Sequence, residues 1–123
     1  MPQPETKANQ LAKGVDAKSK MNGLETKYAQ LLQVEQFKGK VLWWKHHPFN
    51  LRLSGMKCFY AIDFCVIRSN LQVESVETKG FMRDDAFVKF KVASEQFPHF
   101  IFTLVTLKDG EFVYRRAQAG EWL

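Results

Sequence analysis

The sequence predicts a mixed α/β fold in which two helices pack on one sheet. Two segments carry apolar residues at three- and four-residue steps, which is typical of amphipathic helices. The segments between and after them alternate apolar and polar residues or form short apolar runs, which is typical of strands. With 123 residues, of which 46% are apolar, the chain is long enough to bury one core.

The composition separates a short N-terminal segment from the rest of the chain. Residues 1–20 contain no aromatic side chain, and their lysines outnumber their acidic residues. This composition favours a solvated tail, with a basic arm that contacts phosphates as the alternative. We therefore expect a basic, flexible tail at residues 1–20 and a single domain at residues 21–123.

Charge and hydropathy limit the class of binding partner and the cellular compartment that we expect for this protein. The net charge of +5 and the pI of about 9.3 favour a polyanionic partner without identifying it. No apolar run approaches the ~20 residues of a membrane-spanning helix, and the N-terminus lacks the apolar stretch of a signal peptide. These features predict a cytoplasmic protein with no membrane partner.

The first helix is expected from Met21 to about Phe37. Asn22 is a good N-cap residue, and Gly39 fits the C-terminal stop. Glu25 lies in the first turn at the margin of the apolar stripe, where it could be a surface residue that favours the helix dipole or a site residue. The stripe itself comprises Leu24, Tyr28, Leu31 and Leu32.

Three strands are expected next, at residues 41–46, 49–53 and 58–67. His47-Pro48 breaks the first from the second, and a turn near Ser54-Gly55 leads to the third.

Asp63 is an anomaly within the third of these strands. By strand alternation it shares a face with four apolar or small residues, which are Phe59, Ala61, Cys65 and Ile67. That face should be covered, and a buried carboxylate needs a charged or metal partner. Asp63 is therefore a candidate site residue.

A turn at Ser69-Asn70 leads to a further strand, residues 72–79, that ends in charged residues. Glu77 and Lys79 point to the same side of this strand, about 7 Å apart by its ~3.3 Å rise per residue. Gly80 breaks the strand, so both side chains lie near its end, where backbone can approach a ligand.

The second helix is expected to start at Arg83-Asp84-Asp85 and to stop before Pro98. An apolar strand at residues 99–107, a turn at Lys108-Asp109-Gly110 and a last strand at residues 111–115 complete the domain.

The histidines and cysteines are interpreted as structural residues. His46, His47 and His99 lack metal-ligand spacing with one another, and their strand and turn positions account for them. Cys58 and Cys65 form no CxxC motif, and we interpret them as buried reduced thiols.

Antiparallel pairing across the Ser69-Asn70 turn would place Asp63 beside Glu77. Two close carboxylates repel, and a Mg²⁺ ion between them resolves that conflict, with the carbonyl of Thr78 as a further ligand. Lys79 would then offset the charge of an attacked phosphate. The alternative is a surface ion pair of Glu77 with a lysine, worth roughly 0.2–1 kcal/mol, with Asp63 unrelated.

The arrangement Asp63…Glu77-x-Lys79, preceded by a helix that carries Glu25, resembles the PD-(D/E)XK nuclease superfamily, which includes restriction endonucleases and Holliday-junction resolvases. A longer run is similar to small phage and prophage endonucleases of that superfamily. The residues that carry this similarity are His47-Pro48-Phe49-Asn50-Leu51-Arg52-Leu53, Asp63-Phe64, Glu77-Thr78-Lys79-Gly80-Phe81-Met82-Arg83-Asp84-Asp85-Ala86 and Val88-Lys89-Phe90-Lys91-Val92-Ala93.

The resemblance spans about residues 21–107 and implies a restriction-endonuclease-like core, in which a helix precedes a mixed central sheet (αβββαβ) with a second helix packed on it. It implies that Asp63 and Glu77 are metal ligands, that Lys79 is the catalytic lysine, and that Glu25 completes the metal site. The residue before the aspartate, usually proline in the superfamily, is Ile62 here, which changes backbone shape rather than chemistry.

Three further basic residues are candidates for DNA contact under the same resemblance. Lys89 and Lys91 would face phosphates from the second helix, and Arg83 would contact the DNA backbone. A solvated helix face is the alternative for the two lysines, and a surface role is the alternative for Arg83.

The function implied is a Mg²⁺-dependent endonuclease of DNA, with Mn²⁺ able to substitute, encoded by a phage or prophage. Branched or junction DNA is the expected substrate, because so small a chain has no separate recognition domain. A homodimer is expected for cutting two strands; Trp43 and Trp44 point to opposite faces, so one of them is available for a base or a partner subunit. The alternatives are a non-catalytic nucleic-acid-binding module on the same fold and an RNA-directed nuclease.

Overall fold

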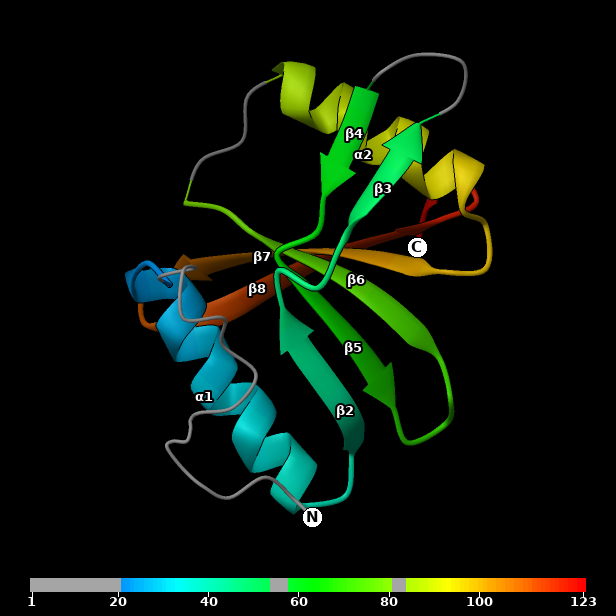
Figure 1. The fold of residues 1–123 in the computed structure, drawn as a ribbon. Coiled ribbons are helices and arrows are strands. Elements are labelled where there is room, and N and C mark those ends of the chain that lie inside the picture. The colour runs from blue at the N-terminus through cyan, green and yellow to red at the C-terminus, as the bar shows by residue number, and fades with distance from the viewer. Residues whose placement is uncertain (1–20, 54–57, 81–83) are drawn as a thin grey trace.

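A computed structural model of the chain describes residues 21–53, 58–80 and 84–123, and it confirms the predicted α/β class (Figure 1). The elements in chain order are α1 (Gly23–Phe37), β2 (Val41–His46), β3 (Asn50–Leu53), β4 (Cys58–Ala61), β5 (Phe64–Arg68), β6 (Val73–Thr78), α2 (Asp84–Gln96), β7 (Ile101–Lys108), β8 (Glu111–Gln118) and β9 (Glu121–Trp122).

Six of the strands form one mixed sheet, in the order β2-β5-β6-β7-β8-β9. All neighbouring strands are antiparallel except β6 and β7, which are parallel and are connected through α2. Strands β3 and β4 pair with each other in a separate two-stranded sheet. The site described below lies where this small sheet leaves the large one.

The prediction of one continuous strand at residues 58–67 is wrong, because the chain divides there into β4 and β5. Together β2–β3 and β4–β5 form a long antiparallel ribbon, and both of its strands are interrupted at the same level. Pro48 has no N–H to donate to a ladder, while the His47 N–H donates to the Asp63 carbonyl at 2.8 Å across the interruption. Beyond this bend the ribbon lies beside α2 instead of in the main sheet (Figure 1).

Helix α1 begins after the predicted N-cap Asn22, two residues later than the expected Met21, and it ends at Phe37 as predicted. The Asn22 side chain accepts a hydrogen bond from the Glu25 N–H at 2.8 Å, and the Glu25 carboxylate accepts one from the Asn22 N–H, which is a capping box. Gly39 has φ +81, a left-handed conformation that favours glycine after a helix. Tyr28 and Leu32 are fully buried and pack, with strand residues that include Phe64, into one core on this face of the sheet.

A second core forms between α2, the β3–β4 hairpin and strands β5, β7 and β8 of the sheet. Phe90 is fully buried and makes edge-on ring contacts with Tyr60 and Phe102. The predicted end of α2 before Pro98 is confirmed, since the helix ends at Gln96. The hairpin therefore carries Tyr60 into the core directly beside the bend of the ribbon.

The C-terminal strands differ in part from the prediction. The predicted turn is present, with left-handed conformations at Asp109 (φ 53) and Gly110 (φ 80). Strand β8 continues to Gln118, three residues beyond the predicted Arg115, and β9 was not predicted. A two-residue strand is too short to leave a periodic pattern in the sequence.

Several smaller predictions are confirmed within the described part of the chain. Trp44 is buried and Trp43 is 42% exposed. Cys58 and Cys65 are free thiols, but only Cys65 is buried as predicted, while Cys58 is partly exposed. Neither described helix is long and apolar enough to cross a bilayer. The predicted N-terminal tail and the turn near Ser54-Gly55 lie outside the described residues.

Candidate functional site

Asp63 lies at the bend of the ribbon, just before β5. Its carboxylate accepts hydrogen bonds from the Thr78 N–H at 2.9 Å and from the Thr78 hydroxyl at 3.3 Å. Because the strand is interrupted here, Asp63 is not on the covered face of a continuous strand, and its side chain is 18% exposed. Burial is still enough to raise the pKa of Asp63 to about 6, against the lowering effect of the Thr78 N–H and with a further raising effect from Glu77.

Glu77 and Lys79 lie at the end of β6 and, as predicted, point the same way. Lys79 Nζ is 3.6 Å from Glu77 Oε2, and the lysine side chain is 43% exposed while that of Glu77 is 10% exposed. The Tyr60 hydroxyl donates a hydrogen bond to Glu77 Oε1. Burial first, and then the charge of Glu77, raise the pKa of Tyr60, so this phenol remains a donor. Glu77 Oε1 is thus held by the core residue Tyr60, and Glu77 Oε2 faces Lys79.

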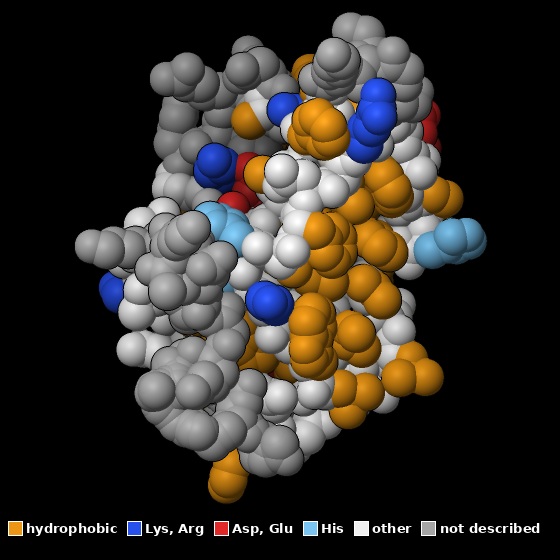
Figure 2. Space-filling view, viewed as in Figure 1, with side chains coloured by type: hydrophobic (Ala, Val, Ile, Leu, Met, Phe, Trp, Pro, Cys, Tyr) orange, Lys and Arg blue, Asp and Glu red, His pale blue; other side chains and the backbone are white. Residues whose placement is uncertain are grey.

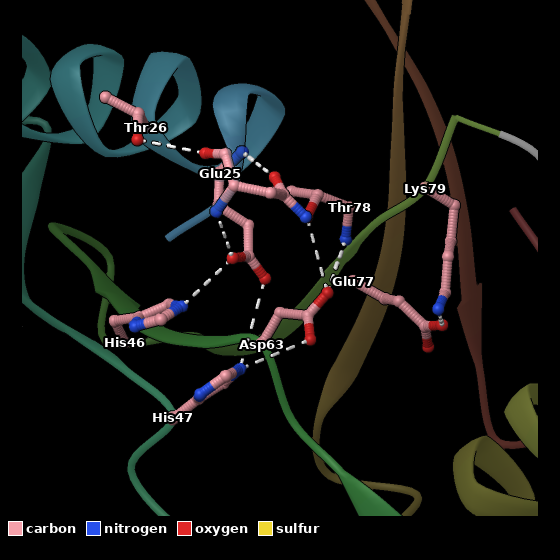
Figure 3. A network of polar contacts seen from close by, with 9 residues as sticks. Glu25, Thr26, His46, His47, Asp63, Glu77, Thr78 and Lys79 are labelled. Carbon is pink, nitrogen blue, oxygen red and sulfur yellow. Dashed lines mark hydrogen bonds and ion pairs between the residues drawn. The ribbon is translucent and has the colours of Figure 1, made fainter. Parts of the chain in front are cut away.

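Asp63, Glu77 and Lys79, which Figure 3 labels, line one pocket of about 200 Å³ together with Lys89 from α2. Its full lining is Tyr60, Ala61, Asp63, Glu77, Lys79, Ala86 and Lys89. Asp63 comes from the bend, Glu77 and Lys79 from the parallel strand β6, and Lys89 from the helix that follows it. Two carboxylates and two lysines from distant parts of the sequence therefore share one opening.

Glu25 is buried, which its place in the first turn of a helix did not predict, and it lies against two histidines. His46 Nε2 is 3.4 Å from Glu25 Oε1, and His47 Nε2 is 3.9 Å from Glu25 Oε2. His47 Nε2 is also 3.8 Å from Asp63 Oδ1, so the histidine stands between the two carboxylates (Figure 3). Glu25 thus borders the Asp63 end of the site through His47.

The interpretation of these two histidines as ordinary strand and turn residues is incomplete. The ligand atoms of Glu25, His46 and His47 all lie within 4.8 Å of one another, so the three could hold a metal ion. Burial, followed by the charge of His47, lowers the pKa of His46, with Glu25 acting in the opposite direction. The adjacent histidines before Pro48 were a usable signal, since a chain reversal there can bring both rings to one side.

Of the two lysines of α2 that were predicted to contact DNA, one lines the pocket and the other does not. Lys89 lines the pocket, but Lys91 does not: its Nζ lies 5.1 Å from the ring centre of Trp122 in a separate groove. Arg83 lies outside the described residues.

Thr78 is placed at the site, as predicted, although through its N–H and hydroxyl, which hold Asp63. That the Thr78 carbonyl coordinates a metal ion remains a prediction.

A further buried carboxylate, Glu74, lies at the other end of β6 and was not predicted to carry any role. It receives hydrogen bonds from Arg68 Nε at 2.8 Å and from the Thr103 hydroxyl. Arg68 also donates to Glu35 of α1 at 2.8 Å. This network fixes α1 to the sheet and leaves Glu74 fully paired, unlike Asp63.

Comparisons of the chain with protein-family models, with curated protein sequences and with solved structures gave no match. Two carboxylates on an open pocket offer the hard oxygen ligands that Mg²⁺ prefers. Two lysines on the same pocket offer charge for an anionic substrate.

Proposed function

We propose that this chain is a metal-dependent endonuclease that hydrolyses DNA phosphodiester bonds with a site of the PD-(D/E)XK type. The observation that carries the proposal is the meeting of Asp63, Glu77 and Lys79 at one pocket. A surface ion pair between Glu77 and Lys79 would not explain why a third charged residue from another strand lies at the same pocket. Here a second carboxylate, partly buried and with a raised pKa, stands across the same opening.

The order of elements supports the same proposal. Helix α1, the antiparallel strands β2, β5 and β6, the crossover helix α2 and the parallel strand β7 follow the order αβββαβ. A restriction-endonuclease-like core has this order, and the β3–β4 hairpin is then an extension of β2 and β5. In such a core the paired carboxylates lie where β5 and β6 meet, which is where Asp63 and Glu77 are found.

The residues present fit a divalent cation. Asp63 and Glu77 supply carboxylate oxygens on an open pocket. The pKa of Asp63 is raised first by burial and then by the charges of Glu77 and Glu25, which is a setting that a bound cation would relieve. Mg²⁺ held there, with Mn²⁺ as a substitute, would supply Lewis-acid activation of the phosphate and an acidified water.

Each side chain around the proposed cation position would have a different role. The Tyr60 hydroxyl holds one oxygen of Glu77 and so fixes the orientation of its carboxylate. Lys79, 43% exposed at the pocket, is placed to donate to a non-bridging phosphate oxygen and to offset the charge that grows in the transition state. Lys89, on the helical wall, would bind a flanking phosphate.

DNA is the proposed substrate, in branched or junction form. The net charge of +5 favours a polyanion, and Figure 2 shows acidic, basic and histidine side chains gathered at one place on the molecular surface. A pair of chains would supply one site for each strand, and exposed apolar side chains such as Trp43 and Phe59 offer area for a subunit contact.

Cleavage of a supercoiled plasmid and of a four-way junction with Mg²⁺ or Mn²⁺ tests the proposal. Wild type should cut, and Asp63→Ala and Lys79→Ala should not, whereas Lys108→Ala at the exposed end of β7 should cut as wild type does. Cutting that survives both site substitutions would refute the assignment of the site. Binding without cutting by wild type would instead favour a nucleic-acid-binding module, and preferential loss of an RNA competitor would favour an RNA-directed nuclease.

A further inference from the structure

Three nitrogen and oxygen ligands converge beside the proposed catalytic pocket without forming part of its lining. Glu25 comes from the first turn of α1, and His46 and His47 come from the end of β2. Glu25 and His46 are both buried, with His46 fully so, while His47 is 43% exposed at the side chain. The cluster is therefore closed on one side and open to solvent on the other, as a site that a small ion can enter must be.

The backbone explains how two adjacent residues reach one carboxylate. Successive side chains of a strand point to opposite faces, yet the His46 and His47 rings stack with centroids 3.9 Å apart. His47 has φ 47, a left-handed conformation that non-glycine residues rarely adopt and that is concentrated at functional sites. This conformation turns the His47 side chain to the same side as His46.

We propose that Glu25, His46 and His47 form a second cation site that takes a transition-metal ion of the Zn²⁺ class. Two imidazoles and one carboxylate are a donor set that suits Zn²⁺ and its neighbours, whereas Mg²⁺ prefers oxygen ligands alone.

The distances fit an ion of this size. Ligands ~2.0–2.1 Å from a tetrahedral Zn²⁺ are about 3.3 Å from one another. His46 Nε2 is 3.4 Å from Glu25 Oε1, and His47 Nε2 is 3.9 Å from Glu25 Oε2. With one ligand atom taken from each residue, all three lie within 4.8 Å of one another, so the ligand atoms close by at most about 1.5 Å around an ion. The exposed His47 ring must turn out of its stack on His46 so that both ring planes point at the ion, while the buried His46 and Glu25 stay in place.

An ion at this position would link the first turn of α1 to the bend of the ribbon. Glu25 belongs to the helix cap, and the His47 N–H is already bonded to the Asp63 carbonyl. The second site would therefore stabilise the segment that carries Asp63 without sharing the Asp63–Glu77 pocket. Binding there does not require that the chain cut DNA, so failure of one proposal leaves the other standing.

Zn²⁺ titration of metal-free, tag-free wild-type protein, followed by NMR of the histidine rings, tests the proposal directly. The chain has three histidines, and His99 lies beyond α2, where it serves as an internal control. The ring signals of His46 and His47 should shift and saturate at one Zn²⁺ per chain, while those of His99 stay in place. An excess of Mg²⁺ should not reverse the shift.

Matched variants separate this site from the catalytic pocket, with Co²⁺ absorption as the readout. His47→Gln, a change at an exposed position, and Glu25→Gln should each weaken Co²⁺ binding at least tenfold. With excess Mg²⁺ present to occupy the Asp63–Glu77 pocket, His99→Gln and Glu77→Gln should leave the Co²⁺ absorption of the histidine site unchanged. Unaltered binding by His47→Gln, or an equal loss in Glu77→Gln, would overturn the proposal, as would shifts of all three histidines together.

Discussion

Replacing Asp63 by asparagine should stabilise the metal-free protein at neutral pH. The Asp63 carboxylate is mostly buried near Glu77, and the pKa rises from 3.8 to about 6 for that reason. Asparagine is close to the same size, carries no charge, and keeps an oxygen that can accept the Thr78 N–H bond now made at 2.9 Å. The substitution therefore removes the unfavourable charge and retains the contact.

The direction of the change in unfolding free energy with pH depends on whether the folded or the unfolded protein binds the Asp63 proton more tightly. A carboxyl whose pKa is higher in the folded state binds its proton more tightly there, so this group lowers the free energy of unfolding as pH rises from about 4 to about 6. At about 1.36 kcal/mol per pKa unit, the full effect above that window is roughly 3 kcal/mol. The variant should match wild type below pH 4 and exceed its stability by up to that amount at pH 7.

Urea unfolding of both proteins across pH 3.5–7.5 measures the difference, in which the other titrating groups cancel. Asp109→Asn, the same change in the exposed β7–β8 turn, is the matched control for the substitution itself. Adding Mg²⁺ at pH 7 should stabilise wild type and not Asp63→Asn. A variant less stable than wild type at pH 7, or a difference independent of pH, would refute the reasoning.

Three further substitutions test how the site is held. Tyr60→Phe should lower the free energy of unfolding by roughly 1.5–3 kcal/mol, because the buried Glu77 loses a hydrogen bond to its charged group; an unchanged urea midpoint would contradict this. Arg68→Met should cost about 3–5 kcal/mol by leaving Glu74 buried without its main partner, and adding Glu74→Gln should recover part of the loss; no recovery in the double variant would count against the account. Asn22→Ala should cost about 1 kcal/mol and loosen the first turn of α1, which amide hydrogen exchange measures; unchanged exchange rates there would show that the cap is not needed.

Local patterns in the sequence predicted most of the fold. The N-cap at Asn22, the stop at Gly39 and the end of α2 before Pro98 depend on nearby residues only, and they are found as predicted. The division of residues 58–67 was missed because apolar alternation continues through it. What interrupts the strand is tertiary: its partner strand breaks at His47-Pro48, and the ribbon turns toward α2.

The candidate site was predictable to the extent that it follows strand periodicity. Spacing along one strand placed Glu77 and Lys79 on the same side, and the structure agrees. Tyr60 reaches Glu77 only because the ribbon bends over α2, and no local pattern indicates that contact. Ligand spacing along the chain does not indicate the histidine pair, because a left-handed residue brings the two rings together.

The most direct test of the central claim is single-turnover cleavage of a labelled four-way junction by wild type and by Lys79→Ala, with DNA binding measured in parallel. Wild type should cut with Mg²⁺ and stop when EDTA is added, because the carboxylate pair acts through a bound cation. Lys79→Ala should bind the junction about as well and cut at least a hundredfold more slowly, since Lys79 acts on charge that develops in the transition state. Equal cleavage by both proteins, or cleavage unaffected by EDTA, would contradict the account.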